Sequence, residues 1–173
     1  VDYELQTTVK GLFAIGECNF SDHGANRLGA SALMQGLADG YFVLPYTIQN
    51  YLSDQITVPR FSTTLPEFDE TEKAVQARID RLMNIKGKSS VDSIHKELGR
   101  IMWDYVGMGR TAEGLKIGIE KIQALRKKFY EDLFIPQLEG VNTELEKAIR
   151  LEDFFLMGQL IAYDALNRNE SCG

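Results

Sequence analysis

The chain has 173 residues, of which 44% are hydrophobic and 25% charged, and its 19 Lys+Arg against 25 Asp+Glu give a formal net charge of −6. This composition is typical of a folded protein, and the length allows one core or two small ones. The acidic balance argues against a surface for duplex nucleic acid or anionic lipid, because both need clustered Lys and Arg. The two cysteines, Cys18 and Cys172, are too few for a disulfide framework or a structural zinc site, so no metal site is expected.

The composition changes near residue 60, within a stretch rich in Thr, Ser and Pro at residues 57–66. We therefore expect one unit over residues 1–60 and a second over residues 61–173. No apolar run is long enough to span a bilayer, so no direct membrane insertion is expected.

In the first unit, residues 3–8 and 12–15 are expected to form two short strands on either side of a turn. The apolar spacing over residues 31–52 predicts a helix, with a kink at Pro45. The first sixty residues are thus expected to run strand, loop, helix.

In the second unit, Pro66 is expected to open a helix that ends near residue 85, where Gly87 would supply a left-handed cap. Ser89 or Ser90 can cap the next helix, which is expected to end at residues 106–109. Thr111 is a plain N-cap for a third helix that runs on to Leu133.

A fourth helix is expected after Thr143, which forms a capping box with Glu146. The last three helices each carry an apolar seam, and short loops between such helices favour antiparallel packing. The seams are Val91, Ile94, Leu98, Ile101 and Tyr105; Leu115, Ile119, Ile122, Leu125 and Phe129; and Ala148, Leu151, Phe155, Gly158, Ala162 and Ala165.

The stretch GLFAIGE at residues 11–17 is followed by DHGANRLGASAL at residues 22–33. A strand that ended at Glu17 would place a carboxylate at the edge where α/β folds bind ligands, and a carboxylate accepts well from sugar or ribityl hydroxyls. Gly24 and Gly29 lack a Cβ, so the backbone there can approach a flat ring system closely.

A helix that begins near Ala30 would direct free N–H groups at negative charge on that ring. Arg27 carries the side chain that best matches a carboxylate through two parallel hydrogen bonds. These residues leave two interpretations open, a structural glycine turn and a ligand site.

The run GLFAIGE…HGANRLG resembles the succinate dehydrogenase/fumarate reductase flavoprotein subunits, where the FAD-binding domain closes on the flavin. The runs HKELGRIMWDYVGMGRT, EKIQALRKKF and LNRNESCG resemble, in order, the C-terminal helical domain of the same subunits. The details look closest to flavoproteins from Bacteroidetes-like bacteria. The resemblance implies a mostly α fold, with short β strands and the glycine-rich loop of an incomplete FAD-binding domain followed by an antiparallel, three-helix-bundle-like domain.

The resemblance also implies roles for individual residues. Glu17 would hydrogen-bond the ribityl chain of FAD, and Arg27 would bind a carboxylate of succinate or fumarate. Ala32 and Leu33 align with a Ser-Leu pair that contacts the pyrimidine edge of the flavin in many relatives; Ala32 lacks the hydroxyl, but both backbone N–H groups remain. Apart from the resemblance, the residue type makes His23 a candidate substrate ligand or catalytic acid, because histidine titrates near neutral pH, and the alternative is a role in structuring the loop. Cys172 stands where many relatives have Arg, which leaves its role in the site in doubt.

The implied activity is the interconversion of succinate and fumarate, with electrons passing through FAD to an iron–sulfur subunit and quinone. A haem-bearing membrane anchor subunit is the other implied partner, at the cytoplasmic face of the inner membrane. The proton-transfer arginine, the histidine that attaches FAD and the dinucleotide-binding glycines of such enzymes do not occur in this sequence. We therefore expect a fragment that neither turns over succinate nor retains FAD by itself. The alternatives are an L-aspartate oxidase-like flavoenzyme and a helical interaction module whose glycine loop is only a turn.

Overall fold

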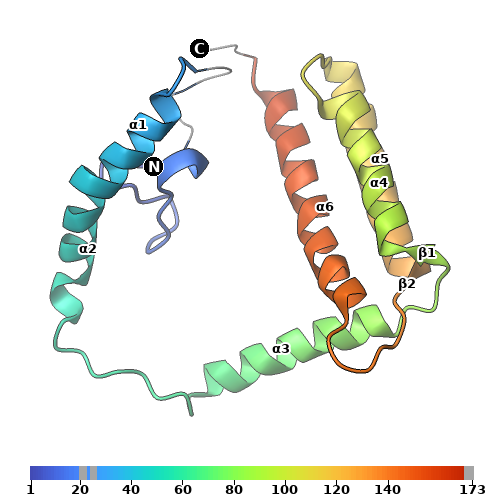
Figure 1. The fold of residues 1–173 in the computed structure, drawn as a ribbon, viewed down its shortest axis with the longest axis horizontal. Coiled ribbons are helices and arrows are strands. Elements are labelled where there is room, and N and C mark those ends of the chain that lie inside the picture. Colours follow the sequence, from blue (N-terminus) through green and yellow to red (C-terminus); the bar gives the residue numbers. More distant parts are fainter. Residues whose placement is uncertain (20–22, 24–26, 170–173) are drawn as a thin grey trace. The chain divides into compact units, whose positions relative to one another are not determined.

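The computed structural model describes residues 1–19, 23 and 27–169, and these form two compact units, Val1–Phe61 and Ser62–Asn169 (Figure 1). Helices dominate both units, and the only extended strands among the described residues are two short ones in the second unit. The expected mostly helical fold is confirmed. No helix within the described ranges combines the length and the apolar character needed to cross a bilayer.

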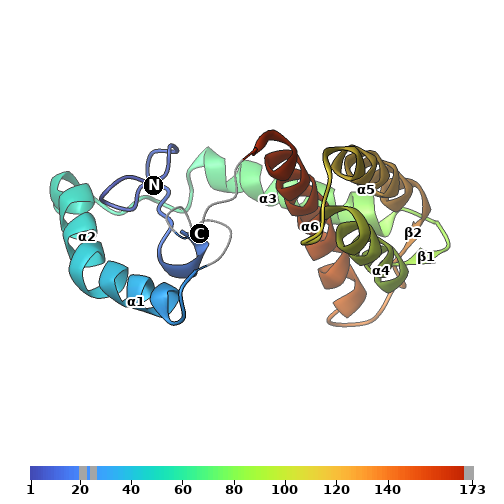
Figure 2. The same ribbon diagram turned by 90° about the horizontal axis from the view of Figure 1, so that it is seen from above.

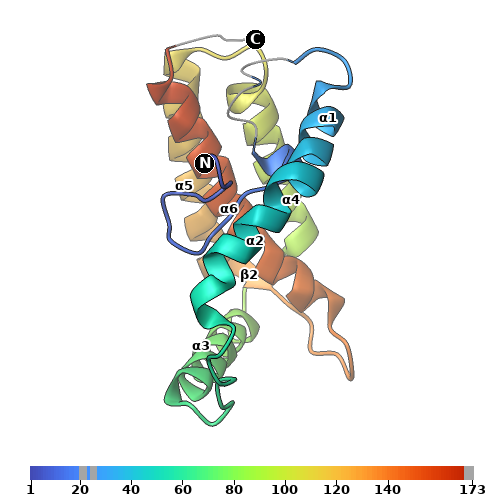
Figure 3. The ribbon, with the colours of Figure 1, turned by 90° about the vertical axis from the view of Figure 1, so that its left-hand side faces the viewer.

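The first unit is built around one bent helical segment, which is seen along its length in Figure 3. Pro45 lies in the first turn of the second half of this segment, where its missing N–H costs no helical hydrogen bond. The expected kink therefore appears as a wide π-helical turn just before Pro45. The elements are η1 (Gly16–Cys18), α1 (Ser31–Ala38), the π turn η2 (Asp39–Val43), α2 (Leu44–Leu52) and η3 (Ser53–Gln55).

The two strands expected in the first unit are reduced to a single antiparallel bridge between Gln6 and Phe13. A pair of strands without a third neighbour is only marginally stable in water. In addition, the Asp2 carboxylate accepts hydrogen bonds from the N–H groups of Glu4 and Gln6, each at 2.9 Å. Glu17 consequently lies on a 3₁₀ turn and not at the edge of a sheet.

The second unit is an antiparallel helical bundle. Helices α4, α5 and α6 lie side by side, and α3 packs against α6 (Figures 1 and 2). A two-residue parallel sheet pairs Ser89 with Leu133 and Ser90 with Phe134. The elements are α3 (Pro66–Met83), β1 (Ser89–Ser90), α4 (Val91–Ile101), the π turn η4 (Met102–Val106), α5 (Ala112–Asp132), β2 (Leu133–Phe134) and α6 (Thr143–Asn167).

The predicted apolar seams form the core of this bundle. All of their members are buried except Tyr105 and Ala165, which are half-buried. Phe129 and Phe155 meet edge to face in the middle, with ring centroids 5.6 Å apart. The core also includes Leu82 of α3, Val106 of η4, and Leu133 and Ile135 after α5.

Of the predicted N-terminal helix caps, two are confirmed and one is wrong. Ser90 accepts from the N–H of Ser93, and Thr111 accepts from the N–H of Gly114. The capping box predicted at Thr143 does not form, because the helix begins one residue earlier than that pattern requires.

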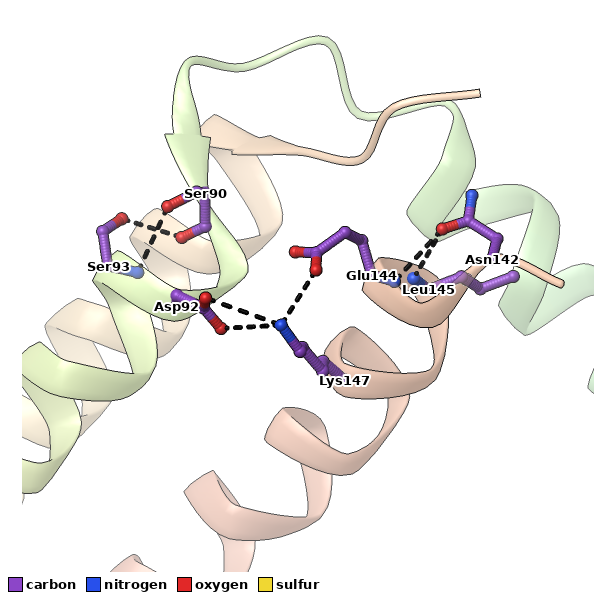
Figure 4. A network of polar contacts seen from close by, with 7 residues as sticks. All are labelled: Ser90, Asp92, Ser93, Asn142, Glu144, Leu145 and Lys147. Atoms are coloured by element: carbon purple, nitrogen blue, oxygen red, sulfur yellow. Dashed lines mark hydrogen bonds and ion pairs between the residues drawn. The ribbon is translucent and has the colours of Figure 1, made fainter. Parts of the chain in front are cut away.

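Asn142 is the residue that caps α6, since its Oδ1 accepts from the N–H groups of Glu144 and Leu145, each at 3.2 Å (Figure 4). One turn on, Lys147 Nζ bridges Glu144 at 2.9 Å and Asp92 of α4 at 3.2 Å. These contacts join the N-terminal ends of α4 and α6 at the surface.

Gly87 does not form the predicted left-handed cap. Its φ angle is not positive, and an added Cβ would lie 1.9 Å from the carbonyl carbon of Asp132. The Gly87 N–H donates to the carbonyl of Leu133 at 3.0 Å, and the Asp132 carboxylate accepts from the Lys88 N–H and the Ser89 hydroxyl. Hydrogen bonding to Ser89 and Lys88 holds the pKa of the Asp132 carboxyl below its ordinary value. Gly87 is thus required by the close approach of two backbone segments.

A buried carboxylate, Glu152, ties α3 and α5 to α6. It accepts from Arg78 Nε, from Arg81 Nη2 at 2.7 Å and from the Tyr130 hydroxyl at 2.7 Å. Burial raises the pKa of the Glu152 carboxyl, but the hydrogen bonds from Arg78 and Tyr130 and the two guanidinium charges outweigh it, so the net pKa lies below its ordinary value. The helices are therefore fixed by charge as well as by apolar packing.

Candidate flavin and substrate site

Glu17 lies in the middle of η1, which packs against α1. Its side chain is exposed, so both carboxylate oxygens can accept hydrogen bonds from outside the chain. Gly16 adopts a φ of 74°, a left-handed conformation that favours glycine, and this turns the backbone into η1. The turn is closed by a hydrogen bond from the Asn19 N–H to the Gly16 carbonyl at 2.9 Å.

The N-terminus of α1 has no side-chain cap. Ala30 occupies the N-cap position with a φ of 63°, and its methyl side chain cannot accept a hydrogen bond from the first turn of the helix. Ala32 is half-buried and Leu33 is 74% exposed, and both lie in this first turn. Since the first N–H groups of a helix have no partner within it, this end can donate hydrogen bonds to an anion.

Arg27 lies just before α1, and its side chain is exposed. Its guanidinium Nη1 donates to the carbonyl of Leu28 at 3.3 Å. His23 is half-buried. Two further residues of the sequence hypothesis, Gly24 and Cys172, lie outside the described residues.

The structure brings η1, which bears Glu17, into contact with α1, and the contacts described lie at Gln35 and Gly36 and, just after α1, at Asp39. Glu17 and the first turn of α1 belong to two elements in direct contact, and Arg27 leads into the same helix. This arrangement fits a flavin cofactor in the chemistry of its groups: an exposed carboxylate can accept from hydroxyls, and an uncapped helix end can face the partial negative charge of a ring carbonyl.

Sequence reasoning missed two residues that hold η1 in place, Gln35 and Asp39. Asp39 is 8% exposed, and its Oδ2 accepts from the N–H of Gly16 at 3.3 Å. Gln35 Nε2 donates to the carbonyl of Asn19 at 2.9 Å. Their spacing in the sequence could have identified them, because polar residues four positions apart on an otherwise apolar helix lie on one face.

Residues 95–173 match the protein family described as "Fumarate reductase flavoprotein C-term". Over its whole length the chain is 30% identical to the succinate dehydrogenase flavoprotein subunit of Bacillus subtilis, of which it covers 29%. It is likewise 30% identical to the fumarate reductase flavoprotein subunit of Haemophilus influenzae, again over all of this chain and 28% of that protein.

A solved structure of an Escherichia coli quinol fumarate reductase variant superposes with a TM-score of 0.78, over 98% of this chain and 28% of the other, at 27% identity. The L-aspartate oxidase of Yersinia pestis is 28% identical over the whole chain and 29% of that protein. The chain therefore spans less than a third of the length of these relatives. Its similarity to succinate dehydrogenase and fumarate reductase flavoprotein subunits nonetheless extends from the η1–α1 region through the helical bundle.

Proposed function

We propose that this chain is the part of a FAD-dependent succinate dehydrogenase or fumarate reductase flavoprotein subunit that closes the flavin site and continues into its helical domain. One observation carries the proposal: the turn that bears the exposed Glu17 packs against α1, whose N-terminus has no side-chain cap. This contact supports the proposal, because an acceptor for hydroxyl groups and a set of donors for negative charge then belong to two neighbouring elements.

Each residue has a distinct role in this proposal. Glu17 accepts a hydrogen bond from the ribityl chain of FAD, and the backbone N–H groups of Ala32 and Leu33 donate to the pyrimidine edge of the flavin. The missing hydroxyl at Ala32 leaves these backbone donors in place. FAD, when bound, supplies the hydride acceptor or donor that interconverts succinate and fumarate.

Arg27 binds the substrate in this proposal. A dianionic substrate must lose water and be oriented, and a guanidinium binds a carboxylate with two parallel hydrogen bonds. In the structure the exposed Arg27 donates from Nη1 to the Leu28 carbonyl at 3.3 Å, just before α1. His23 is retained as a second substrate ligand.

The proposed partners follow from the same family. Electrons would pass to an iron–sulfur subunit and then to quinone, through a complex with a haem-bearing membrane anchor at the cytoplasmic face of the inner membrane. The similarity to a quinol fumarate reductase supports this assignment.

An L-aspartate oxidase activity is the second candidate, favoured by the similarity to the Yersinia pestis enzyme. The flavin contacts would be the same in both, and the substrate would differ by an amino group. Purified complete subunit that oxidised L-aspartate but not succinate would select this second candidate.

The test of the proposal is Arg27→Ala in the complete flavoprotein subunit, with Arg60→Ala as a matched control on an exposed arginine of the same unit. We expect Arg27→Ala to lower kcat/KM for succinate at least about a hundredfold with FAD content unchanged, because a charge-assisted bidentate contact is lost. Arg60→Ala should leave both unchanged. If Arg27→Ala turned over succinate like the wild type, the substrate role would be wrong, as the interaction-module alternative predicts.

We also propose that residues 1–173 by themselves bind FAD weakly and do not turn over succinate. In the described part of the first unit, Leu5 is the one buried apolar side chain, so little packing holds the site in shape. A purified chain of these residues that was yellow and active on succinate would contradict this.

A further inference from the structure

Helix α1 and the turn that follows it hold both ends of η1 through two hydrogen bonds. The Asp39 carboxylate accepts from the Gly16 N–H at the start of η1, and the Gln35 amide donates to the Asn19 carbonyl just after its end. Gln35 and Asp39 are four residues apart, so one helical face makes both bonds. Glu17 lies between the two anchoring points.

The residues of this turn are not part of a packed interior. A Cβ added at Gly16 would meet nothing within 4 Å, and none of the three residues of η1 is buried. The two hydrogen bonds are better shielded, because Asp39 and Asn19 are each 8% exposed. Among the described contacts, these two bonds are therefore the ones that fix the η1 backbone on α1.

Asp39 is also the first residue of the π-helical turn η2. Such turns are rare, and they occur often at functional sites because they redirect a residue that a regular helix would place elsewhere. A carboxylate as an acceptor for a backbone N–H makes a charge-assisted bond, which is stronger than a neutral one. Loss of this side chain would leave the Gly16 N–H without its partner in a shielded place.

We propose that Gln35 and Asp39 are positioning residues for the flavin site, which set where Glu17 stands relative to the ribityl chain. This inference rests on the role proposed for Glu17. Neither side chain touches the cofactor in this proposal, and both act through the backbone of η1.

The experiment uses the complete subunit with Asp39→Ala, Asp39→Asn, Gln35→Met and Glu17→Ala. The matched control is Thr47→Val, since Thr47 is also buried in this unit and donates to the carbonyl of Glu4, away from η1. The readouts are FAD affinity, the flavin midpoint potential and thermal unfolding.

We expect Asp39→Ala and Gln35→Met each to weaken FAD binding about tenfold and to shift the flavin potential, whereas Thr47→Val does neither. Asp39→Asn should restore most of the affinity, because an amide oxygen can still accept from Gly16. In the Glu17→Ala background, Asp39→Ala should have no further effect on affinity, since it acts through a side chain that is no longer present.

The outcomes separate the two proposals. If Glu17→Ala weakens FAD binding while Asp39→Ala and Gln35→Met match Thr47→Val, the positioning role is wrong and the role of Glu17 stands. If Glu17→Ala binds FAD like the wild type, the proposed function of Glu17 fails first. Additive losses in the double variant would show that Asp39 acts independently of Glu17. If Asp39→Ala does not fold, Gln35→Met decides by the same criteria.

Discussion

The contact of Glu152 with α3 and α5 offers the sharpest test of what stabilises the helical bundle. Glu152 is 7% exposed, and removing its carboxylate takes away the partner of two guanidinium groups and the Tyr130 hydroxyl. A hydrogen bond to a charged group contributes about 1.5–3 kcal/mol, but the side chains of Arg78 and Arg81 are 36% and 57% exposed and can be rehydrated. We therefore expect Glu152→Ala to lower the free energy of unfolding by about 2–4 kcal/mol.

Glu152→Gln separates charge from shape, because the amide keeps one acceptor oxygen in nearly the same place. We expect Glu152→Gln to lower the free energy of unfolding by about 1–2 kcal/mol at pH 7. The control is Glu146→Gln, since Glu146 pairs with Arg150 on the surface of the same helix at 2.7 Å. An exposed pair four residues apart contributes less than about 0.5 kcal/mol.

The pH dependence has a definite sign. The folded-state pKa of Glu152 is lowered, so its contribution to stability is fully present above the ordinary carboxyl value of 4.5 and is lost as the pH falls through the folded value. The difference in unfolding free energy between wild type and Glu152→Gln should thus stay constant from pH 7 to about 5 and then shrink.

Urea unfolding followed by circular dichroism at several pH values measures these differences. The reasoning is refuted if Glu152→Gln matches Glu146→Gln at pH 7. It is equally refuted if the gap to the wild type widens on acidification.

Three further variants test individual features of the bundle by the same unfolding assay. Gly87→Ala should lower the free energy of unfolding by about 3 kcal/mol or more, because the added Cβ would collide with the Asp132 backbone. Gly109→Ala is the control and should lower it by less than about 0.5 kcal/mol, since the space around Gly109 is open. Equal effects of the two substitutions would contradict the structure. Asn142→Ala should lose about 1 kcal/mol with the cap of α6, and a neutral result would argue against that cap. Phe155→Ala should lose about 3–5 kcal/mol by opening a cavity in the core, and a loss below about 1 kcal/mol would show that the side chain is not buried there.

The helical bundle could be predicted from the sequence because its helices and buried faces depend on residues that lie close together in the sequence. Each seam repeats with the period of a helix, so the buried residues of α4, α5 and α6 follow from spacing alone. The start of α3 at Pro66 and the caps at Ser90 and Thr111 are also set by neighbouring residues. Asn142 was missed because the capping pattern one residue later matched equally well, and local rules do not rank two adjacent candidates.

Features that depend on distant residues could not be predicted in this way. Arg78 and Glu152 are 74 positions apart, and nothing in the sequence indicates that they meet. The same holds for Gly87, whose constraint comes from Asp132 across the bundle. In the first unit, the expected strands lacked a neighbour to pair with, so strand-like composition alone did not produce a sheet.

The proposed site also has parts that the sequence indicated and parts that only the fold made visible. The roles of Glu17, Arg27, Ala32 and Leu33 came from resemblance, since the residues by themselves left a glycine turn and a ligand site equally open. The contact of Asp39 with Gly16 spans 23 positions and became visible only with the fold.

The two units are stabilised by different interactions, and this difference affects the proposed flavin site. The bundle has a continuous apolar core, whereas the first unit relies on polar contacts such as those from Thr47 and Asn50 to Glu4. Exposed hydrogen bonds contribute little net stability because water competes for them, so a unit whose described residues include one buried apolar side chain unfolds locally at low cost. The shielded contact of Asp39 with Gly16 then sets the position of η1, and any ligand that engages Glu17 and the start of α1 together would stabilise the unit by its own binding energy. On this view, cofactor binding and the ordering of residues 1–61 are one linked equilibrium.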